Sequence, residues 1–379
     1  MDGATDLVCI SHLRWNFVFQ RPNHLMSRCA RERRTFFFEE PAPGDEARVA
    51  VREIRENLFN AVPHLPPETS GVDAGERQRR LLDGMLRDYG VRRFILWLYT
   101  PMALPFTRHL DPVCTVYDCM DELSAFHGAP PVLLQQEQEL FRRADLVFTG
   151  GASLYESKRA HHPSVHELPS SVDAAHFGRA RRGLADPTDQ APLSWPRVGY
   201  FGVIDERMDL ELLAAIADAR PRWSVIMVGP VVKIDPERLP RRPNIHYLGQ
   251  KTYEQLPAYL AGWDVAMMPF ALNESTRFIS PTKTLEYLAA GKPVVSTAIR
   301  DVVHPYGERG LVRIADHATF VRAIDAALAE APGPRQAAAD DLLAKTSWDA
   351  TWTRMSRLIS TVTAQKLRSE EGKRTCSTI

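Results

Sequence analysis

The chain has 379 residues, in which 47 lysines and arginines balance 47 aspartates and glutamates, and 44% of the residues are hydrophobic. At one domain per roughly 100 to 200 residues, this length predicts two domains. The neutral total argues against a dedicated nucleic-acid-binding protein, and the hydrophobic fraction argues against a disordered or fibrous chain. The longest apolar runs, such as residues 95–99, are far shorter than the roughly 20 residues that span a bilayer.

The N-terminal residues MDGATDLVCISHLRW lack a basic region followed by an apolar one, so we expect no signal peptide and a cytoplasmic location. Cysteines are few and odd in number, at five. Cys9, Cys29 and Cys114 lie in apolar surroundings, which predicts buried free thiols and no disulfide framework.

Short apolar, β-branched runs alternate with helical patterns along the chain, which predicts an α/β fold with parallel sheets covered by helices. In the first half, strands are expected at residues 6–10, 34–39, 94–99, 114–118, 146–149 and 165–168. Helices are expected between them, including residues 22–32, with a proline in the first turn, and residues 130–144, whose leucines share one stripe. These elements predict a first Rossmann-like domain over residues 1–177.

At residues 178–195 Gly, Pro, Arg and Asp replace any periodic apolar face, which predicts an exposed linker. A second Rossmann-like domain is expected over residues 196–345. Its strands are expected at residues 197–203, 223–229, 244–249, 264–270, 293–297 and 311–315, and its helices at residues 209–219, 252–263, 281–291 and 317–331.

A last helix is expected over residues 346–362, because Trp348, Trp352, Met355 and Ile359 fall on one apolar stripe. The polar residues 363–379 that follow are predicted to be disordered.

Ligands of parallel α/β sheets bind beyond the carboxyl ends of the strands, so the loops there are the place to look for function. One such loop and helix read NESTRFISPTKTLEYLAAGKPVV, from Asn273 onwards. Ser280 and Pro281 are expected to open a helix whose first amides and Lys283 form an anion site. Glu286, one turn further on, is placed to accept two ribose hydroxyls. The simpler alternative is a serine N-cap beside a solvated lysine and glutamate.

That segment, together with NIHYLGQKTYEQLPAYLAGWDVAMMPF and ELPSSVDAAHF before it, resembles retaining glycosyltransferases of family 4 with the GT-B fold. Residues 12–28, HLRWNFVFQRPNHLMSR, and residues 273–283 resemble most closely the teichuronic-acid-type members. The resemblance covers residues 8–352. It implies two Rossmann-like domains facing across a cleft, with a C-terminal helix returning to the first domain.

The resemblance also implies transfer of a sugar, with retention, from a UDP- or GDP-linked donor to a hydroxyl of a polysaccharide, a lipid-linked acceptor or a metabolite. It implies no cofactor and no metal. Glu286 matches the second Glu of the family's Glu-x7-Glu motif and is implied to bind the ribose. The segment from Gly249 to Tyr253 is implied to pass the nucleobase, with either Tyr253 or Lys251 flanking it. The remaining donor-side residues that it implies are Gly202, Ser280, Thr282 and Lys283.

Two departures from the family are visible. The Arg and Lys that normally follow the turn at Gly202 are absent, so Arg207 is expected to supply the charge. Phe278 stands where the first Glu of the motif belongs, so either Asn273 or Glu274 replaces that Glu or the donor is recognised differently.

On the acceptor side, the loop after the first strand offers His12 as a catalytic candidate and Trp15 as either a stacking platform for a sugar or a hydrophobic lid. Asp118 and Asp121, three residues apart, would share a helix face and act as a base for the acceptor hydroxyl or bind a metal. Their alternative role is an N-cap and a helix-dipole carboxylate. Further acceptor-side candidates are Gln20 and Arg21.

Two other functions remain open: a non-hydrolysing sugar-nucleotide epimerase, and a degenerate module that binds nucleotide sugar or glycan without turnover. Residues 77–93 form a basic amphipathic stretch, which is either a solvated helix face or a contact with the inner face of the membrane. Nucleic acid is not expected as a partner.

Overall fold

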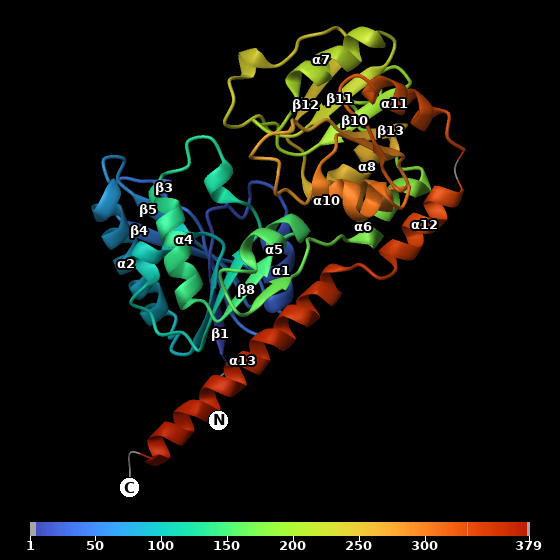
Figure 1. Ribbon diagram of the computed structural model, residues 1–379. Coiled ribbons are helices and arrows are strands. Elements are labelled where there is room, and N and C mark those ends of the chain that lie inside the picture. Colours follow the sequence, from blue (N-terminus) through green and yellow to red (C-terminus); the bar gives the residue numbers. More distant parts are fainter. Residues whose placement is uncertain (1–4, 332, 377–379) are drawn as a thin grey trace. The chain divides into compact units, whose positions relative to one another are not determined.

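The computed structural model describes residues 5–331 and 333–376. Within this range the chain forms two compact units (Figure 1). Unit 1 contains residues 5–124, 128–169 and 349–376, and unit 2 contains residues 125–127 and 170–348. Each is an α/β unit built around its own sheet, as the alternation of strand and helix patterns predicts.

Unit 1 contains a nine-stranded sheet in the order β3-β5-β2-β1-β6-β7-β8-β9, with β4 paired to β5. Every pair is parallel except β4 with β5. The strands are β1 (Asp6–Ile10), β2 (Thr35–Phe38), β3 (Ala42–Pro43), β4 (Arg48–Arg55), β5 (Leu58–Leu65), β6 (Phe94–Leu98), β7 (Cys114–Cys119), β8 (Leu146–Thr149) and β9 (Val165–Glu167).

The hairpin of β4 and β5 was not predicted. Its turn contains Asn57 with φ of 62°, a left-handed conformation that asparagine adopts more easily than most residues. Strand β4 is largely exposed and carries several arginines, which hides the apolar pattern of a strand. Charged side chains on an outer strand also hinder pairing with another chain.

Helices cover both faces of this sheet (Figure 1). Leu96 and Leu98 of β6 face the side of α3 and α4, whereas Trp97 between them faces α13, with its ring centroid 6.2 Å from that of Trp352. The helices of unit 1 are α1 (Arg21–Cys29), α2 (Gly71–Asp88), α3 (Leu104–Thr107), α4 (Val132–Arg143), α5 (Ala152–Lys158) and α13 (Trp348–Cys376), of which Trp348 itself belongs to unit 2.

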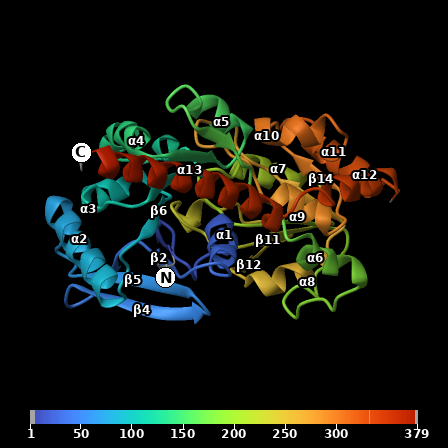
Figure 2. The same ribbon diagram turned by 90° about the horizontal axis from the view of Figure 1, so that it is seen from below.

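The return of a C-terminal helix to the first domain is confirmed, since α13 runs along unit 1 (Figure 2). The indole N–H of Trp352 donates to Glu32 at 2.6 Å, and Lys366 pairs with Asp145 at 2.6 Å. The prediction that the helix ends at residue 362 is wrong, because α13 continues to Cys376. The anchoring pair at Lys366 lies beyond the apolar stripe, where the hydrophobic pattern gave no sign of it.

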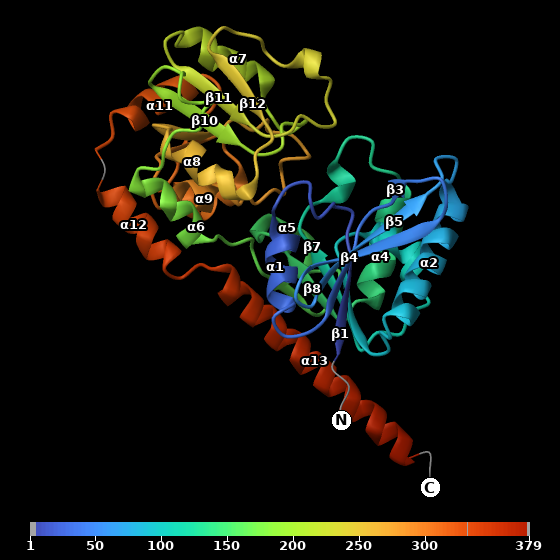
Figure 3. The same ribbon diagram turned by 180° about the vertical axis from the view of Figure 1, so that it is seen from behind.

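Unit 2 contains a six-stranded sheet in the order β12-β11-β10-β13-β14-β15, all parallel. Figure 3 shows α8 and α9 on one side of this sheet and α7 and α11 on the other. The strands are β10 (Arg197–Phe201), β11 (Ser224–Val228), β12 (Ile245–Gly249), β13 (Val265–Met268), β14 (Val294–Ser296) and β15 (Arg313–Ile314). The helices are α6 (Ala174–Gly178), α7 (Leu210–Ala219), α8 (Leu256–Ala261), α9 (Lys283–Ala289), α10 (Arg300–Val302), α11 (Phe320–Leu328) and α12 (Pro334–Leu343).

Short 3-10 segments complete the fold, together with one π-helical turn at Val303–Gly307. The 3-10 segments are Pro101–Ala103, Leu123–Ala125, Arg179–Arg182, Pro236–Arg238 and Tyr253–Gln255.

The expected exposed linker at residues 178–195 is instead packed on unit 2. Gln190 is fully buried; its amide donates to Tyr259 O at 3.1 Å and its oxygen accepts from the indole of Trp263 at 2.9 Å. Arg197, 1% exposed, pairs with Asp186 of the same segment. Polar contacts of this kind leave no apolar periodicity in the sequence, so the segment resembled a linker.

Among the described residues no helix is long and apolar enough to cross a membrane. The basic stretch at residues 77–93 lies mostly in α2, where Arg77 pairs with Asp73, and Arg79 and Arg80 both pair with Glu76. Four of the cysteines, Cys9, Cys29, Cys114 and Cys119, are buried and free, and this confirms the expectation for the first three.

Candidate functional site

Three glycines lie side by side where neighbouring strands of unit 2 end. Gly202, Gly229 and Gly249 follow β10 and β11 and end β12, with φ values of 137°, 144° and 70°. The Gly202 amide donates to Val228 O at 2.8 Å and the Gly229 amide donates to Gly249 O at 2.9 Å. A Cβ at Gly229 would overlap the carbonyl oxygen of Gly202. This edge is therefore bare backbone that a ligand can approach closely. Gly229 was not among the predicted site residues, although it ends a predicted strand.

Lys283 of α9 lies at this edge, next to Gly202, and Glu286 lies three residues further along the same helix. A Cβ at Gly202 would overlap the Lys283 side chain, and Lys283 Nζ lies 5.6 Å from the centre of the Tyr200 ring. Glu286 is 9% exposed, and burial raises its pKa to about 7, against the opposing effect of the Lys283 charge. A cation thus lies against the backbone of Gly202, and a buried carboxyl group lies three residues further along the same helix.

The start of α9 differs from the prediction. The helix begins at Lys283, two residues beyond the expected position, with Thr282 as the N-cap residue and no side-chain cap. The Thr284 amide donates to Pro281 O at 3.1 Å in a turn that precedes the helix. Ser280 therefore lies in the incoming loop and does not cap the helix.

The loop from β13 to α9 is held by its own side chains. Asn273 Oδ1 accepts from Ser275 Oγ at 2.7 Å and from the Thr276 amide at 3.2 Å, and Thr276 Oγ1 donates to Ala271 O at 2.6 Å. Glu274 is largely exposed and lies 3.7 Å from Arg277, whose guanidinium stacks over the Phe278 ring at 5.2 Å. Asn273 thus shapes the loop, whereas Glu274 points to solvent.

Arg207 does not contribute an uncompensated charge to the site. Its Nε and Nη2 bind both oxygens of Asp205, with the Nη2–Oδ2 bond at 2.7 Å, and Asp205 is 4% exposed. The expectation that Arg207 replaces the family's missing cations overlooked this acid two residues earlier. Lys283 is therefore the cation that the described structure places next to Gly202.

Tyr253 forms an aromatic stack beyond the end of β12. Its ring lies parallel to the imidazole of His176, with centroids 4.1 Å apart and planes 7° apart. His176 Nε2 contacts Tyr253 O at 2.9 Å, and burial lowers the pKa of this histidine. His176 was not predicted as a site residue, although it lies in the ELPSSVDAAHF segment that carries part of the resemblance.

In unit 1, two predicted site residues bind each other. Arg21 is 1% exposed and Asp118 is fully buried, and Arg21 Nη2 donates to Asp118 Oδ1 at 2.8 Å. Asp118 lies in β7, whereas Asp121 lies in the loop beyond it. The prediction that the two aspartates share one face of a helix is therefore wrong. The apolar, β-branched run around Asp118 favours a strand, in which residues three apart point to opposite faces. Asp118 is inaccessible to an acceptor, and Asp121 is half-buried.

The remaining candidates surround the loop after β1. Trp15 is 7% exposed and packs edge-on against Phe37 at 5.1 Å, so it offers no exposed stacking platform. Gln20 is the N-cap residue of α1, and its backbone amide donates to Asn23 Oδ1 at 3.0 Å. His12 is half-buried in the same loop.

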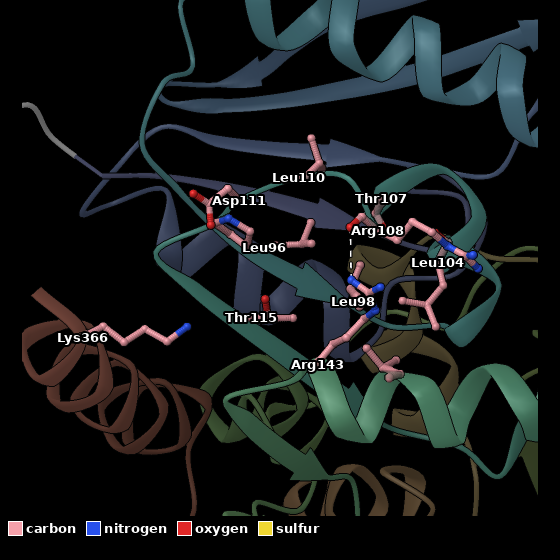
Figure 4. A pocket seen from close by; sticks show the side chains of 12 residues that line it. Leu96, Leu98, Leu104, Thr107, Arg108, Leu110, Asp111, Thr115, Arg143 and Lys366 are labelled. Carbon is pink, nitrogen blue, oxygen red and sulfur yellow. Dashed lines mark hydrogen bonds between the residues drawn. The ribbon is translucent and has the colours of Figure 1, made fainter. Parts of the chain in front are cut away.

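A pocket of about 210 Å³ lies elsewhere in unit 1, between β6, β7, α3 and α4 (Figure 4). Its lining includes none of the predicted site residues. Within residues 5–331 and 333–376, no three His, Cys, Asp or Glu side chains gather so that they could hold a metal ion.

Comparison with known proteins connects this geometry to a family. Residues 196–330 match the family described as glycosyl transferases group 1, and this range contains the three glycines, Lys283 and Glu286. A Bacillus subtilis protein named as the teichuronic acid biosynthesis glycosyltransferase TuaH is 27% identical over 224 residues. That alignment covers 54% of this chain and 55% of the relative, about half the length of each.

Solved structures match almost the whole chain. Sucrose-phosphate synthase from Thermosynechococcus elongatus aligns with a TM-score of 0.74 at 15% identity, covering 96% of this chain and 100% of that one. An E. coli structure described as trehalose-6-phosphate bound with UDP-2-fluoro glucose gives 0.71 at 14% identity, covering 95% and 99%. The trehalose 6-phosphate synthase of Burkholderia multivorans gives 0.69 at 13%, covering 97% and 99%. The chain therefore has the predicted two-domain GT-B fold, and residues 196–330 form a domain that matches the group 1 glycosyl transferases.

Proposed function

We propose that this protein is a glycosyltransferase that moves a sugar from a nucleoside diphosphate sugar to a hydroxyl group of an acceptor. The match of residues 196–330 to group 1 glycosyl transferases supports this, as does the similarity to TuaH. The name of that relative, which refers to teichuronic acid biosynthesis, favours a polysaccharide or its lipid-linked precursor as acceptor. We further propose that the protein acts in the cytoplasm or at the inner face of the membrane. The E. coli structure with UDP-2-fluoro glucose favours a UDP-linked donor.

The observation that carries the proposal is the position of Lys283 beside Gly202, with Glu286 three residues further along the same helix. Two phosphates of a donor need positive charge near open backbone, and Lys283 lies beside the side-chain-free turn at Gly202. A ribose needs a carboxylate that accepts from two hydroxyls, and Glu286 lies one helical turn away in a partly desolvated position. Desolvation strengthens such hydrogen bonds because the local dielectric is low.

In the proposed reaction the bond between the anomeric carbon and the phosphate oxygen breaks, and the acceptor oxygen bonds to that carbon. The acceptor proton passes to the leaving phosphate oxygen, and the product keeps the donor's anomeric configuration. The negative charge that develops on the leaving diphosphate is stabilised by Lys283 and by backbone amides, without a metal ion. In this proposed site the wall beside the base is formed by Tyr253 and Gly249. The wall beside the phosphates is formed by Ser280, and Thr282 lies at the start of the helix that follows.

The experiment is a thermal-shift and calorimetric screen of UDP-, GDP-, dTDP- and CDP-sugars, followed by a donor-consumption assay. Glu286→Ala and Lys283→Ala should each weaken donor binding or turnover at least tenfold, which is about 1.4 kcal/mol. Glu237→Ala is the control, because Glu237 is an exposed member of a surface ion pair in the same unit. Wild-type binding and turnover in both site variants would refute the assignment.

The same screen separates the other two functions. Donor conversion without any acceptor would identify an epimerase. Donor binding without consumption, across a panel of acceptors, would identify a binding module. Two features favour a binding module over an epimerase. Phe278 stands where the family has a glutamate, and Arg207 is bound to Asp205.

A further inference from the structure

One arginine joins the loop after β1 to the ends of two other strands at the carboxyl edge of the unit 1 sheet. Arg21 is the first residue of α1, directly after the loop at residues 11–20, and its Nε and Nη2 bind Asp118 of β7 at 2.8 to 3.1 Å. Its Nη1 donates to Leu168 O at 2.8 Å, just beyond β9. A single buried side chain thus ties the loop after β1 to the ends of β7 and β9, which lie further along the same sheet.

The first turn of α1 also holds the loop itself. Asn23 Nδ2 donates to Trp15 O at 2.9 Å, and Asn23 Oδ1 accepts from the Gln20 amide at 3.0 Å. On the other side, the Trp15 amide donates to Glu39 Oε2 at 2.6 Å. The backbone of residues 11–20, which includes His12, therefore takes its position from the turn that Arg21 fixes.

A buried ion pair is a poor way to add stability, because desolvating both charges offsets much of their attraction. Its clearest use is to fix geometry, since a bidentate guanidinium–carboxylate pair tolerates little displacement. At 1% and 0% exposure, Arg21 and Asp118 cannot contact a substrate in this conformation. The pair therefore serves to position the loop after β1 and not to bind a ligand from solvent.

We propose that Arg21 and Asp118 are positioning residues, which hold the loop at residues 11–20 in the conformation required for sugar transfer. This inference rests on the proposed glycosyltransferase function. It reassigns Asp118 from a base or metal ligand, and Arg21 from an acceptor contact, to a support beneath the loop. Loss of the pair should lower kcat while donor binding in unit 2 is preserved.

The sheet supplies a matched control at its opposite edge. Arg34 binds Asp6 through two bonds, at 2.9 and 2.7 Å, at the amino end of β1. This pair has the same residue types and two-pronged geometry and is far along the strand from the loop at residues 11–20, but Arg34 is 40% exposed whereas Arg21 is 1% exposed. Asp6→Asn therefore reports the effect of breaking a partly exposed pair of this kind in unit 1.

The test compares Asp118→Asn, Arg21→Lys, Asn23→Ala and Asp6→Asn with the wild type. Turnover is measured with whichever of UDP-, GDP-, dTDP- and CDP-glucose the wild type consumes, and donor Kd is measured by calorimetry. We expect Asp118→Asn and Asn23→Ala to lower kcat at least tenfold with donor Kd changed less than twofold, Arg21→Lys to be intermediate, and Asp6→Asn to keep wild-type kcat. Asn23→Ala removes no charge and serves if Asp118→Asn fails to fold.

Hydrogen–deuterium exchange of residues 11–20 gives a second, activity-independent readout. Faster exchange of this loop is expected in Asp118→Asn and Asn23→Ala, but not in Asp6→Asn. Unchanged exchange, or a kcat that falls no further than in Asp6→Asn, would overturn the positioning role. Absence of any donor consumption by the wild type would instead refute the proposed function, and the exchange measurement would still decide the role of the pair.

Discussion

Replacing Glu286 with glutamine should change how stability depends on pH. Burial raises the pKa of Glu286 from its ordinary value of 4.5 to about 7. Between these two values the folded protein keeps the proton while the unfolded chain loses it, so the free energy of unfolding falls as pH rises. At about 1.4 kcal/mol per pH unit, the full effect is about 3 kcal/mol between pH 4 and pH 8. The glutamine variant has no such group and lacks this loss.

The assay is urea unfolding of wild type and Glu286→Gln at pH 5, 6, 7 and 8, monitored by tryptophan fluorescence, with Glu237→Gln as the exposed control. The stability of the variant relative to wild type should increase by about 2.5 kcal/mol between pH 5 and pH 8. Lys283→Met should move the window to higher pH, because it removes the positive charge that opposes the rise in the pKa of Glu286. A difference between variant and wild type that stays constant from pH 5 to pH 8 would refute the reasoning. Donor affinity should follow the same titration in the opposite sense, strengthening as Glu286 ionises.

Three further variants test other parts of the structure. Gly202→Ala forces a side chain into a left-handed turn and against Lys283, so calorimetry should show donor binding at least tenfold weaker, whereas Gly84→Ala, with open space around it in α2, should leave binding unchanged. Lys158→Met leaves the buried Glu137 and the half-buried Glu122 without their shared cation and should cost about 3–5 kcal/mol in chemical denaturation; a loss below 1 kcal/mol would show that these acids are solvated. Trp352→Ala should destabilise unit 1 by about 3–5 kcal/mol, since its ring is 6% exposed, and an unchanged melting temperature would mean that α13 contributes little.

The fold and one part of the site were predictable because their signals are local. The apolar runs that end at Gly202, Gly229 and Gly249 are strands, and the parallel α/β order brings their ends to one edge. Lys283 and Glu286 lie three residues apart on one helix, so their proximity follows from helix geometry alone.

The rest depends on partners distant in sequence. Asp118 was misplaced because its partner, Arg21, lies 97 residues away. Gln190 also has a distant partner, since its side-chain oxygen accepts a hydrogen bond from the indole of Trp263. The segment that contains Gln190 is therefore packed, although its sequence is typical of a linker. Arg207 is the exception, since Asp205 is only two residues away; its pairing was missed because the family pattern drew attention to missing cations and not to nearby acids.

The path of α13 has a consequence for biosynthesis. Trp97 is fully buried, and part of its cover is Trp352, a residue synthesised more than two hundred positions later. While the ribosome is still making unit 2, unit 1 lacks this cover, and the apolar face around β6 is exposed. Unit 2 has its own core within residues 170–348 and can complete it before the last helix emerges. The unit whose chain is started first is therefore finished last, and its uncovered face is a surface that a chaperone can bind in the meantime.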